Sequence, residues 1–303
     1  MKKFLLALLV PCLSLGAFAQ QAFQAQAILS TKDGANSVAW ILEASDRQIR
    51  YKTTEIATSS EIGNIANYSL IYLMEPTEYS EAMDLFEAGK FKEAKEKFAA
   101  YKELSKPTAA LKGNFHTLSA FYEMECMRHL GDYAGLATAL ESFFKEPLSR
   151  DHHLRQLDLY VLWTAVQSES WDRLLILTSQ RDDENLPGYQ RAQVAFCKGL
   201  ALQKKEGPQP LDALIEYGFA MTADSAASRV IAQDAALNSL QIYFEDAEVQ
   251  AAMANWGTDD ENKGSVGYGR LLEAAGLAKI YQSFLKLDKE LSEDHAKFLK
   301  FNS

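Results

Sequence analysis

The chain lacks net positive charge, and after its first residues it lacks an apolar run long enough to cross a bilayer. It carries 31 Lys and Arg against 41 Asp and Glu, a formal net charge of −10 at pH 7. Nucleic acid and anionic lipid both require neutralising Lys and Arg, so neither suits this chain as a partner. A membrane-spanning helix needs about 20 apolar residues, which excludes an integral membrane span after the N-terminal segment.

Motifs of common enzyme classes are also missing. The sequence contains no G-x-S-x-G nucleophile motif and no H-E-x-x-H zinc motif. Asp151, His152 and His153 spell a phosphoesterase signature, but the additional Asp and His clusters that hold two metals are absent upstream. A helix N-cap or a solvated loop is the favoured interpretation of this triplet. The acidic loop at 259–262 fails the ligand spacing of an EF-hand. We therefore expect no enzyme activity, no metal and no cofactor.

Residues 1–19 have the pattern of a secretory signal peptide. Two lysines precede an apolar run, and the segment ends in the small-x-small sequence Ala17-Phe18-Ala19. Cleavage after Ala19 predicts a periplasmic or secreted protein that begins at Gln20. Loss of the two lysines changes the formal charge from −10 to −12. The alternative, lipidation of Cys12, is disfavoured because Pro11 stands where a small residue is required.

Residues 20–75 are expected to form a small β-domain. Short runs rich in β-branched and aromatic residues alternate with turn signals such as Lys32-Asp33-Gly34. The five predicted antiparallel strands are 24–31, 37–45, 48–54, 57–61 and 69–74. This pattern resembles small SH3- or Sm-like barrels that precede helical repeats in exported bacterial proteins.

The most informative stretch is 76–107, which predicts two amphipathic helices joined at Gly89. Apolar residues recur at intervals of three or four on both sides of this glycine. The pattern resembles the tetratricopeptide (TPR) repeat, whose turn glycine, aromatic, small and proline positions match Gly89, Phe91, Ala94, Phe98 and Pro107. The small Ala94 would let the helices approach closely.

One helical pair cannot bury its own apolar faces, so related helical pairs should follow this stretch along the chain. They are predicted at 112–145, 153–182, 188–223 and 227–255, with Ser170 replacing the turn glycine in the third pair. A final helix at 268–290 would cap the array, and 291–303 would form a short charged tail with partly helical character. The fold class is therefore mainly α: a TPR-like α-solenoid over 76–290 that follows the small barrel.

Two cysteines remain in the mature chain, Cys126 and Cys197. Export would permit a disulfide between them. Both fall in predicted helices of pairs that are two apart, and such pairs do not touch in a solenoid. Two buried thiols are therefore favoured over a disulfide.

The resemblance implies a non-enzymatic scaffold or adaptor that binds a protein or peptide partner. Assembly of the cell envelope is one process in which such a scaffold would act. In TPR proteins the first helices of the pairs line a concave groove, and aromatic side chains there serve as anchors. The groove residues expected here are Tyr79, Met83, Phe86, Phe121, Arg128, Trp163 and Phe196. The competing interpretation places these residues in an ordinary core. The alternative functions are a hydrolase with a site built across repeats and a self-assembling structural subunit.

Overall fold

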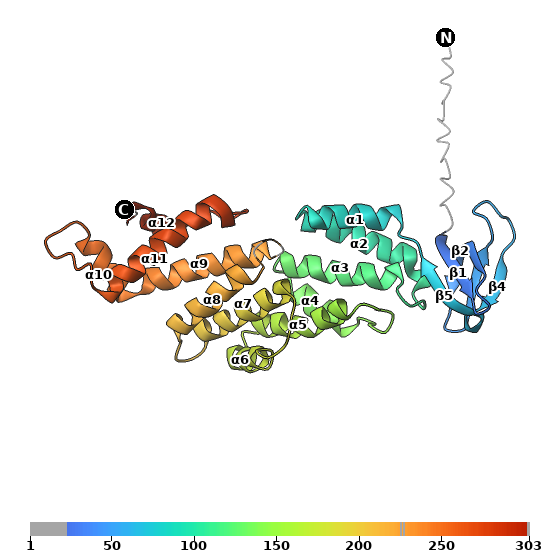
Figure 1. Ribbon diagram of the computed structural model, residues 1–303, viewed down its shortest axis with the longest axis horizontal. Coiled ribbons are helices and arrows are strands. Elements are labelled where there is room, and N and C mark those ends of the chain that lie inside the picture. The colour runs from blue at the N-terminus through green and yellow to red at the C-terminus, as the bar shows by residue number, and fades with distance from the viewer. Residues whose placement is uncertain (1–22, 225, 227, 302–303) are drawn as a thin grey trace, which may run out of the picture. The chain divides into compact units, whose positions relative to one another are not determined.

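The computed structural model describes residues 23–224, 226 and 228–301, and the chain divides into two compact units between Met74 and Glu75 (Figure 1). The predicted signal peptide, 1–19, lies outside the described residues. The first unit is a sheet and the second is helical, so the expected change from strands to helices is confirmed.

The first unit is a five-stranded antiparallel sheet with the order β4-β3-β2-β1-β5. Its strands are β1 (Ala25–Thr31), β2 (Asn36–Ala44), β3 (Gln48–Lys52), β4 (Glu61–Asn64) and β5 (Tyr68–Leu73). The prediction of strand at 57–61 is wrong at all but its last residue, because 53–60 form turns and bends and β4 starts only at Glu61. A short 3-10 helix, Ile65–Asn67, connects β4 to β5.

The buried face of the sheet follows the period-two alternation of its strands. Ala27 of β1 lies opposite Ala39 of β2 on one side and Leu73 of β5 on the other. These residues and Ile41 are buried, whereas Arg50 and Glu43 pair across the exposed face at 2.9 Å. Strand β1 is therefore held by apolar contacts on both of its sides.

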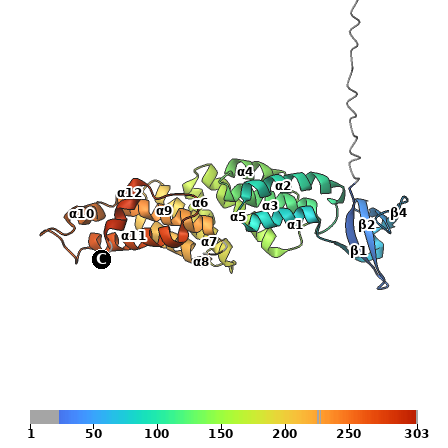
Figure 2. The same ribbon diagram turned by 90° about the horizontal axis from the view of Figure 1, so that it is seen from above.

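The second unit contains helices in all five predicted pairs. In order, the paired helices are α1 (Thr77–Glu87) and α2 (Phe91–Ser105), α3 (Phe115–His129) and α4 (Tyr133–Glu141), α5 (Asp151–Gln167) and α6 (Trp171–Ser179), α7 (Gly188–Lys204) and α8 (Pro210–Ala223), and α9 (Arg229–Glu245) and α10 (Ala247–Asn255). Each helix packs against the next along the chain. The first helices also pack on one another, since α1 contacts α3, α5 contacts α7 and α7 contacts α9 (Figures 1 and 2).

The turns of the first three helical pairs each contain a residue with a left-handed backbone conformation. Gly89 and Gly131 have φ values of 75° and 71°, and Glu169 occupies the same place in the third turn with a φ of 50°. An aromatic residue starts the next helix two positions later in each case, and in the third pair it is Trp171. The left-handed residue of this turn is therefore Glu169, and not Ser170 as the sequence alignment of the pairs suggested.

Small residues permit close helix approach inside the pairs. Ala94 of α2 is fully buried. In the fourth pair Gly199 of α7 faces Tyr217 of α8, and a Cβ on Gly199 would lie only 2.7 Å from the tyrosine ring. Gly218 of α8 has open space around it. The same residue type thus has a packing role at one position and none at the other.

The C-terminal region folds back onto the last helices. The predicted final helix is α11 (Val266–Ile280), which a π-helical turn extends over Tyr281–Leu285. The segment predicted as a charged tail contains α12 (Glu293–Ala296) and a 3-10 helix (Lys297–Phe301). Phe298 is fully buried against Leu240 and Leu271, and Phe301 packs on Trp256, so aromatic side chains dock this segment. The tail prediction missed these contacts because they are made with residues far away in the chain, which the local sequence does not reveal.

No helix in the described ranges combines the length and the apolar character that crossing a bilayer requires.

Gly199→Ala should lower the free energy of unfolding by about 1–3 kcal/mol, because the added methyl overlaps the buried Tyr217 ring. Gly218→Ala is the matched control and should raise it by about 0.5–1 kcal/mol through helix propensity. Urea unfolding of both variants measures the difference. Equal stabilisation by the two substitutions would contradict the close approach of α7 and α8.

Glu169→Gly should stabilise the protein by about 0.5–1 kcal/mol, because a non-glycine residue is strained at a φ of 50°. The reverse change, Gly131→Ala in the equivalent turn, should destabilise it. Thermal unfolding of the two variants tests the equivalence of these turns, and a loss of stability in Glu169→Gly would refute it.

Candidate functional site

A cavity of about 220 Å³ lies within the helical unit and is lined by the first helix of each pair. Helices α1, α3, α5, α7 and α9 all contribute, although the lining residues are spread over about half of the chain. The lining residues are Phe86, Phe121, Tyr122, Glu125, Arg128, His129, His152, His153, Gln156, Tyr189, Ser228 and Ile231.

The helical spacing of α3 supplies the central wall of this cavity. Phe121, Glu125 and Arg128 follow one another at intervals of four and three residues, so they share one helix face. Tyr122 and His129 flank that face. On the other side the first turns of α5 contribute His152, His153 and Gln156.

The prediction for the Asp151-His152-His153 triplet needs correction. Arg150, and not Asp151, is the N-cap residue of α5, and no side chain caps this helix terminus. The triplet is not a solvated loop either, because it begins the helix and His153 is buried. Asp151 is exposed in the first turn, where its charge suits the positive end of the helix dipole.

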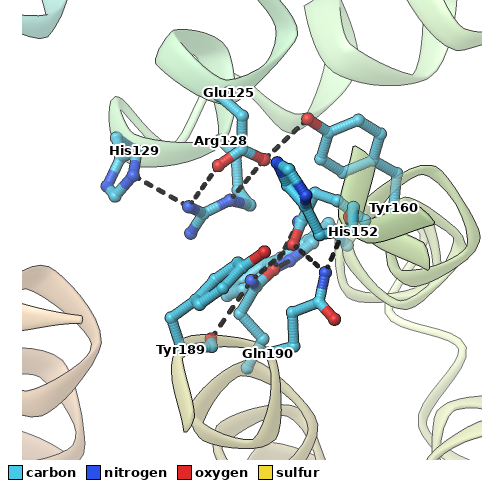
Figure 3. Close-up of polar contacts among 10 residues, drawn as sticks. Glu125, Arg128, His129, His152, Tyr160, Tyr189 and Gln190 are labelled. Atoms are coloured by element: carbon cyan, nitrogen blue, oxygen red, sulfur yellow. Dashed lines mark hydrogen bonds and ion pairs between the residues drawn. The ribbon is translucent and has the colours of Figure 1, made fainter. Parts of the chain in front are cut away.

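Glu125 and Arg128 form a buried ion pair at the cavity wall, with side chains 8% and 6% exposed. Arg128 donates from Nη2 to Glu125 Oε2 at 2.7 Å and from Nε to Oε1 at 3.2 Å. The hydroxyl of Tyr160 on α5 donates to Oε1 at 2.6 Å (Figure 3). The guanidinium carbon also lies 6.0 Å from the ring centre of Trp163. The carboxylate and the guanidinium therefore neutralise each other without solvent.

Electrostatic interactions at the cavity wall keep Glu125 and Arg128 charged and keep the neighbouring His129 neutral. Burial by itself raises the pKa of Glu125, but the guanidinium of Arg128 and the hydrogen bonds to the carboxylate hold it below the usual value. The attraction of Glu125 likewise outweighs burial and raises the pKa of Arg128. Burial, with the charge of Arg128, lowers the pKa of His129 to about 3. His129 is consequently neutral at neutral pH.

His153 is the least satisfied polar side chain of the cavity. It is 2% exposed, and neither of its buried ring nitrogens has a hydrogen-bond partner among the described residues. Its ring packs against Phe121 at 4.5 Å and Tyr122 at 5.8 Å between ring centres. Burial and the nearby His152 and Arg150 lower its pKa to about 4, so His153 is also neutral at pH 7.

A network of buried amides joins α5 to α7 beside the cavity. Gln156 and Gln193 exchange two hydrogen bonds, at 2.9 and 3.0 Å. The indole N–H of Trp163 donates to Gln193 Oε1 at 2.9 Å, and Gln190 donates to the carbonyl of His152 at 3.1 Å. These bonds fix the register of the two helices.

The predicted groove residues separate into two groups. Phe86, Phe121 and Arg128 line the cavity. Tyr79, Trp163 and Phe196 do not line it and are 6%, 2% and 5% exposed.

Neighbouring rings enclose these three buried aromatics. Tyr79 packs on Phe115, and Trp163 packs on Phe196. These three are core residues and lack the exposure that an anchor site requires. Met83 is half-buried on α1 and lies outside the cavity lining.

Sequence reasoning missed His129, His153, Tyr122 and Tyr189 as lining residues. The sequence contained a signal for His129 and Tyr122, because both lie next to the stripe of α3 that runs from Phe121 to Arg128. The sequence singles out His153 only within the Asp151-His152-His153 triplet, and its place at the cavity depends on how α5 starts and on its packing against α3.

Cys126 and Cys197 follow the prediction of buried thiols, since both are buried and unpaired. Burial raises the pKa of Cys126 to about 12 and also raises that of Cys197. Within the described ranges no group of three or more His, Cys, Asp and Glu side chains is placed to hold a metal ion.

Comparison with known proteins returns no matching family model, no matching curated protein and no matching solved structure.

His153 should make the protein less stable in mild acid. Its pKa is about 4 in the folded state and 6.5 without burial, so the unfolded chain binds the proton more readily. Its contribution to stability is therefore complete above pH 6.5 and is lost as the pH falls toward 4. Between pH 7 and pH 5 this residue should lower the free energy of unfolding by about 1–2 kcal/mol.

Urea unfolding at pH 7, 6 and 5 measures this effect in His153→Leu, which should lose that part of the pH dependence. His116→Leu, on the same helix as the ion pair but outside the cavity, is the control for the replacement of an imidazole by an apolar side chain. An unchanged pH dependence in His153→Leu would show that the imidazole is not buried as described.

Proposed function

We propose that this protein is an exported, non-enzymatic scaffold whose TPR-like helical unit binds a partner protein by taking an apolar anchor side chain into the cavity of the first helices. The observation that carries the proposal is the lining itself, in which one side chain or more comes from each of α1, α3, α5, α7 and α9. A partner that occupies this cavity would contact five helical pairs at once.

Size and chemistry of the cavity suit a side chain from a partner. An apolar cavity of about 150 Å³ accommodates benzene, and this cavity has about 220 Å³. Phe86, Phe121, Tyr122 and Ile231 supply apolar contacts. Its strongest charges, on Glu125 and Arg128, already satisfy each other. Buried aromatic anchors of this kind are typical hot spots of protein interfaces.

Charge on α1 favours a partner segment with Lys or Arg beside the anchor. Exposed acidic residues stand at every third position of this helix, at Glu78, Glu81, Asp84 and Glu87. Phe86 of the same helix lines the cavity. Opposite charge at the rim of an interface speeds encounter and excludes wrong partners.

The finer fold assignment belongs to the same proposal. Side-by-side packing of successive first helices supports an α-solenoid, and the turns at Gly89, Gly131 and Glu169 support its TPR-like character. In the first unit, pairing of β1 with both β2 and β5 is compatible with a sheet that curls into a small SH3- or Sm-like barrel. Export rests on the signal-peptide pattern of residues 1–19.

Selection from a random peptide display library, with the mature protein as bait, tests the proposal. We expect the selected peptides to combine an apolar or aromatic residue with nearby Lys or Arg. His152→Trp places a large ring at the cavity lining and should weaken binding of these peptides by about 30-fold, the equivalent of one strong hot spot of about 2 kcal/mol.

Ile215→Trp is the matched control, because Ile215 is 59% exposed on α8 and does not line the cavity. This variant should bind as the wild type does, and circular dichroism melts should show both variants folded. Failure to select any peptide, or equal affinity of wild type and folded His152→Trp, would reject the proposed function.

A further inference from the structure

The cavity is lined by polar groups whose hydrogen bonds are not completed by the described residues. The first belongs to Arg128. Its Nε and Nη2 nitrogens donate to Glu125 and His129, but Nη1 makes no hydrogen bond among the described residues (Figure 3). A guanidinium nitrogen can only donate. Arg128 therefore offers a free donor at the cavity wall.

A second donor follows from the chemistry of the His129 contact. Arg128 Nη2 lies 2.8 Å from His129 Nε2. Because arginine cannot accept, Nε2 of this neutral imidazole must be the acceptor, and the ring proton is on Nδ1. That Nδ1 is buried and has no partner in the described part of the chain. His129 thus has an unpaired N–H group.

The third group is His153, which lines the same cavity with both ring nitrogens buried and unpartnered. A neutral imidazole has one donor and one acceptor. Leaving buried polar groups unpaired is costly in general, so an occupant that pairs with them gains affinity. The nitrogens of Arg128 and His129 therefore offer donors and His153 offers an acceptor, beside the hydroxyl groups of Tyr122, Tyr189 and Ser228 in the same lining.

Two further polar residues of the lining are already paired, and they restrict the charge of the occupant. Gln156 is bonded to Gln193, and Glu125 is bonded to Arg128 and Tyr160. The charges of Glu125 and Arg128 cancel, so the wall carries no uncompensated charge that would hold a buried anion. Arg150 and Arg155 are exposed near His152 and remain in water.

Resting on the proposed function, we infer that the anchor bound in the cavity is a neutral phenol, a tyrosine side chain of the partner, and that the cavity discriminates it from phenylalanine. A phenol oxygen accepts from Arg128 or His129 and its hydroxyl donates to the free nitrogen of His153. Phenylalanine has the same ring and makes neither bond. Tryptophan has a donor only, and a carboxylate or phosphate brings a charge that nothing at the wall balances.

Binding of p-cresol, toluene and 4-methylbenzoate to the mature protein tests this inference, with ligand-observed NMR titration as the measurement. These probes share a methylated ring and differ in the polar group. We expect p-cresol to bind about 10-fold or more tightly than toluene, because sites built to bond a hydroxyl reject the analogue without it. The 4-methylbenzoate anion should bind more weakly than p-cresol.

His153→Leu should reduce the preference for p-cresol over toluene, whereas the matched variant His116→Leu should retain it. His152→Trp should abolish binding of both probes. The selected partner peptides provide the second arm, in which Tyr→Phe at the anchor should weaken binding about 10-fold and p-cresol should compete with the peptide.

The outcomes separate this inference from the function on which it rests. Equal affinity for toluene and p-cresol, both abolished by His152→Trp, would overturn the tyrosine assignment and leave the anchor site intact. Tightest binding of 4-methylbenzoate would overturn the neutrality of the anchor. A p-cresol preference that persists in folded His153→Leu would remove His153 from the recognition. No binding of any probe, together with peptide binding that His152→Trp does not change, would overturn both proposals.

Discussion

The buried ion pair of Glu125 and Arg128 constrains the whole centre of the helical unit. Two charges removed from water must be paired and hydrogen-bonded, and removal of one partner from such a pair costs about 3–5 kcal/mol. Here α3 supplies both charges at a spacing of three residues, and α5 must approach closely enough for Tyr160 to reach the carboxylate. The cavity lies beside this pair, and its lining has no net charge because the charges of Glu125 and Arg128 cancel.

The amide network of α5 and α7 imposes a second constraint of the same type. Gln156 and Gln193 are almost completely buried, and each completes the hydrogen bonds of the other. A shift of one helix along its neighbour would leave both amides unpaired in a low-dielectric interior, which is unfavourable. Trp163 is fixed by the same Gln193 and stacks on Tyr133, so its indole packs in the core. Polar side chains thus set the register of α5 against α7, while burial of apolar surface supplies most of the driving force for folding.

Local sequence patterns were sufficient for most secondary structure and for little of the site. Runs of β-branched and aromatic residues between turn signals located four of the five strands within two residues at either end, and glycine with a following aromatic located the first two helical turns. The third turn was misaligned because Glu169 takes a left-handed conformation that sequence assigns to glycine. The predicted anchors at Tyr79, Trp163 and Phe196 lie in the core instead, because an apolar stripe marks a face and does not state whether another helix covers it.

The sequence by itself determined the change from sheet to helices near residue 75, the five helical pairs and the buried state of Cys126 and Cys197. These features depend on periodicity, on glycine and on residue type, which are local properties. Only the tertiary structure decided that His153, His129 and Arg128 share one cavity and that Phe298 docks the C-terminal segment. Such groupings depend on the crossing and register of helices that are far apart in the chain. The interactions that fix them are a few buried polar contacts whose partners cannot be inferred from spacing.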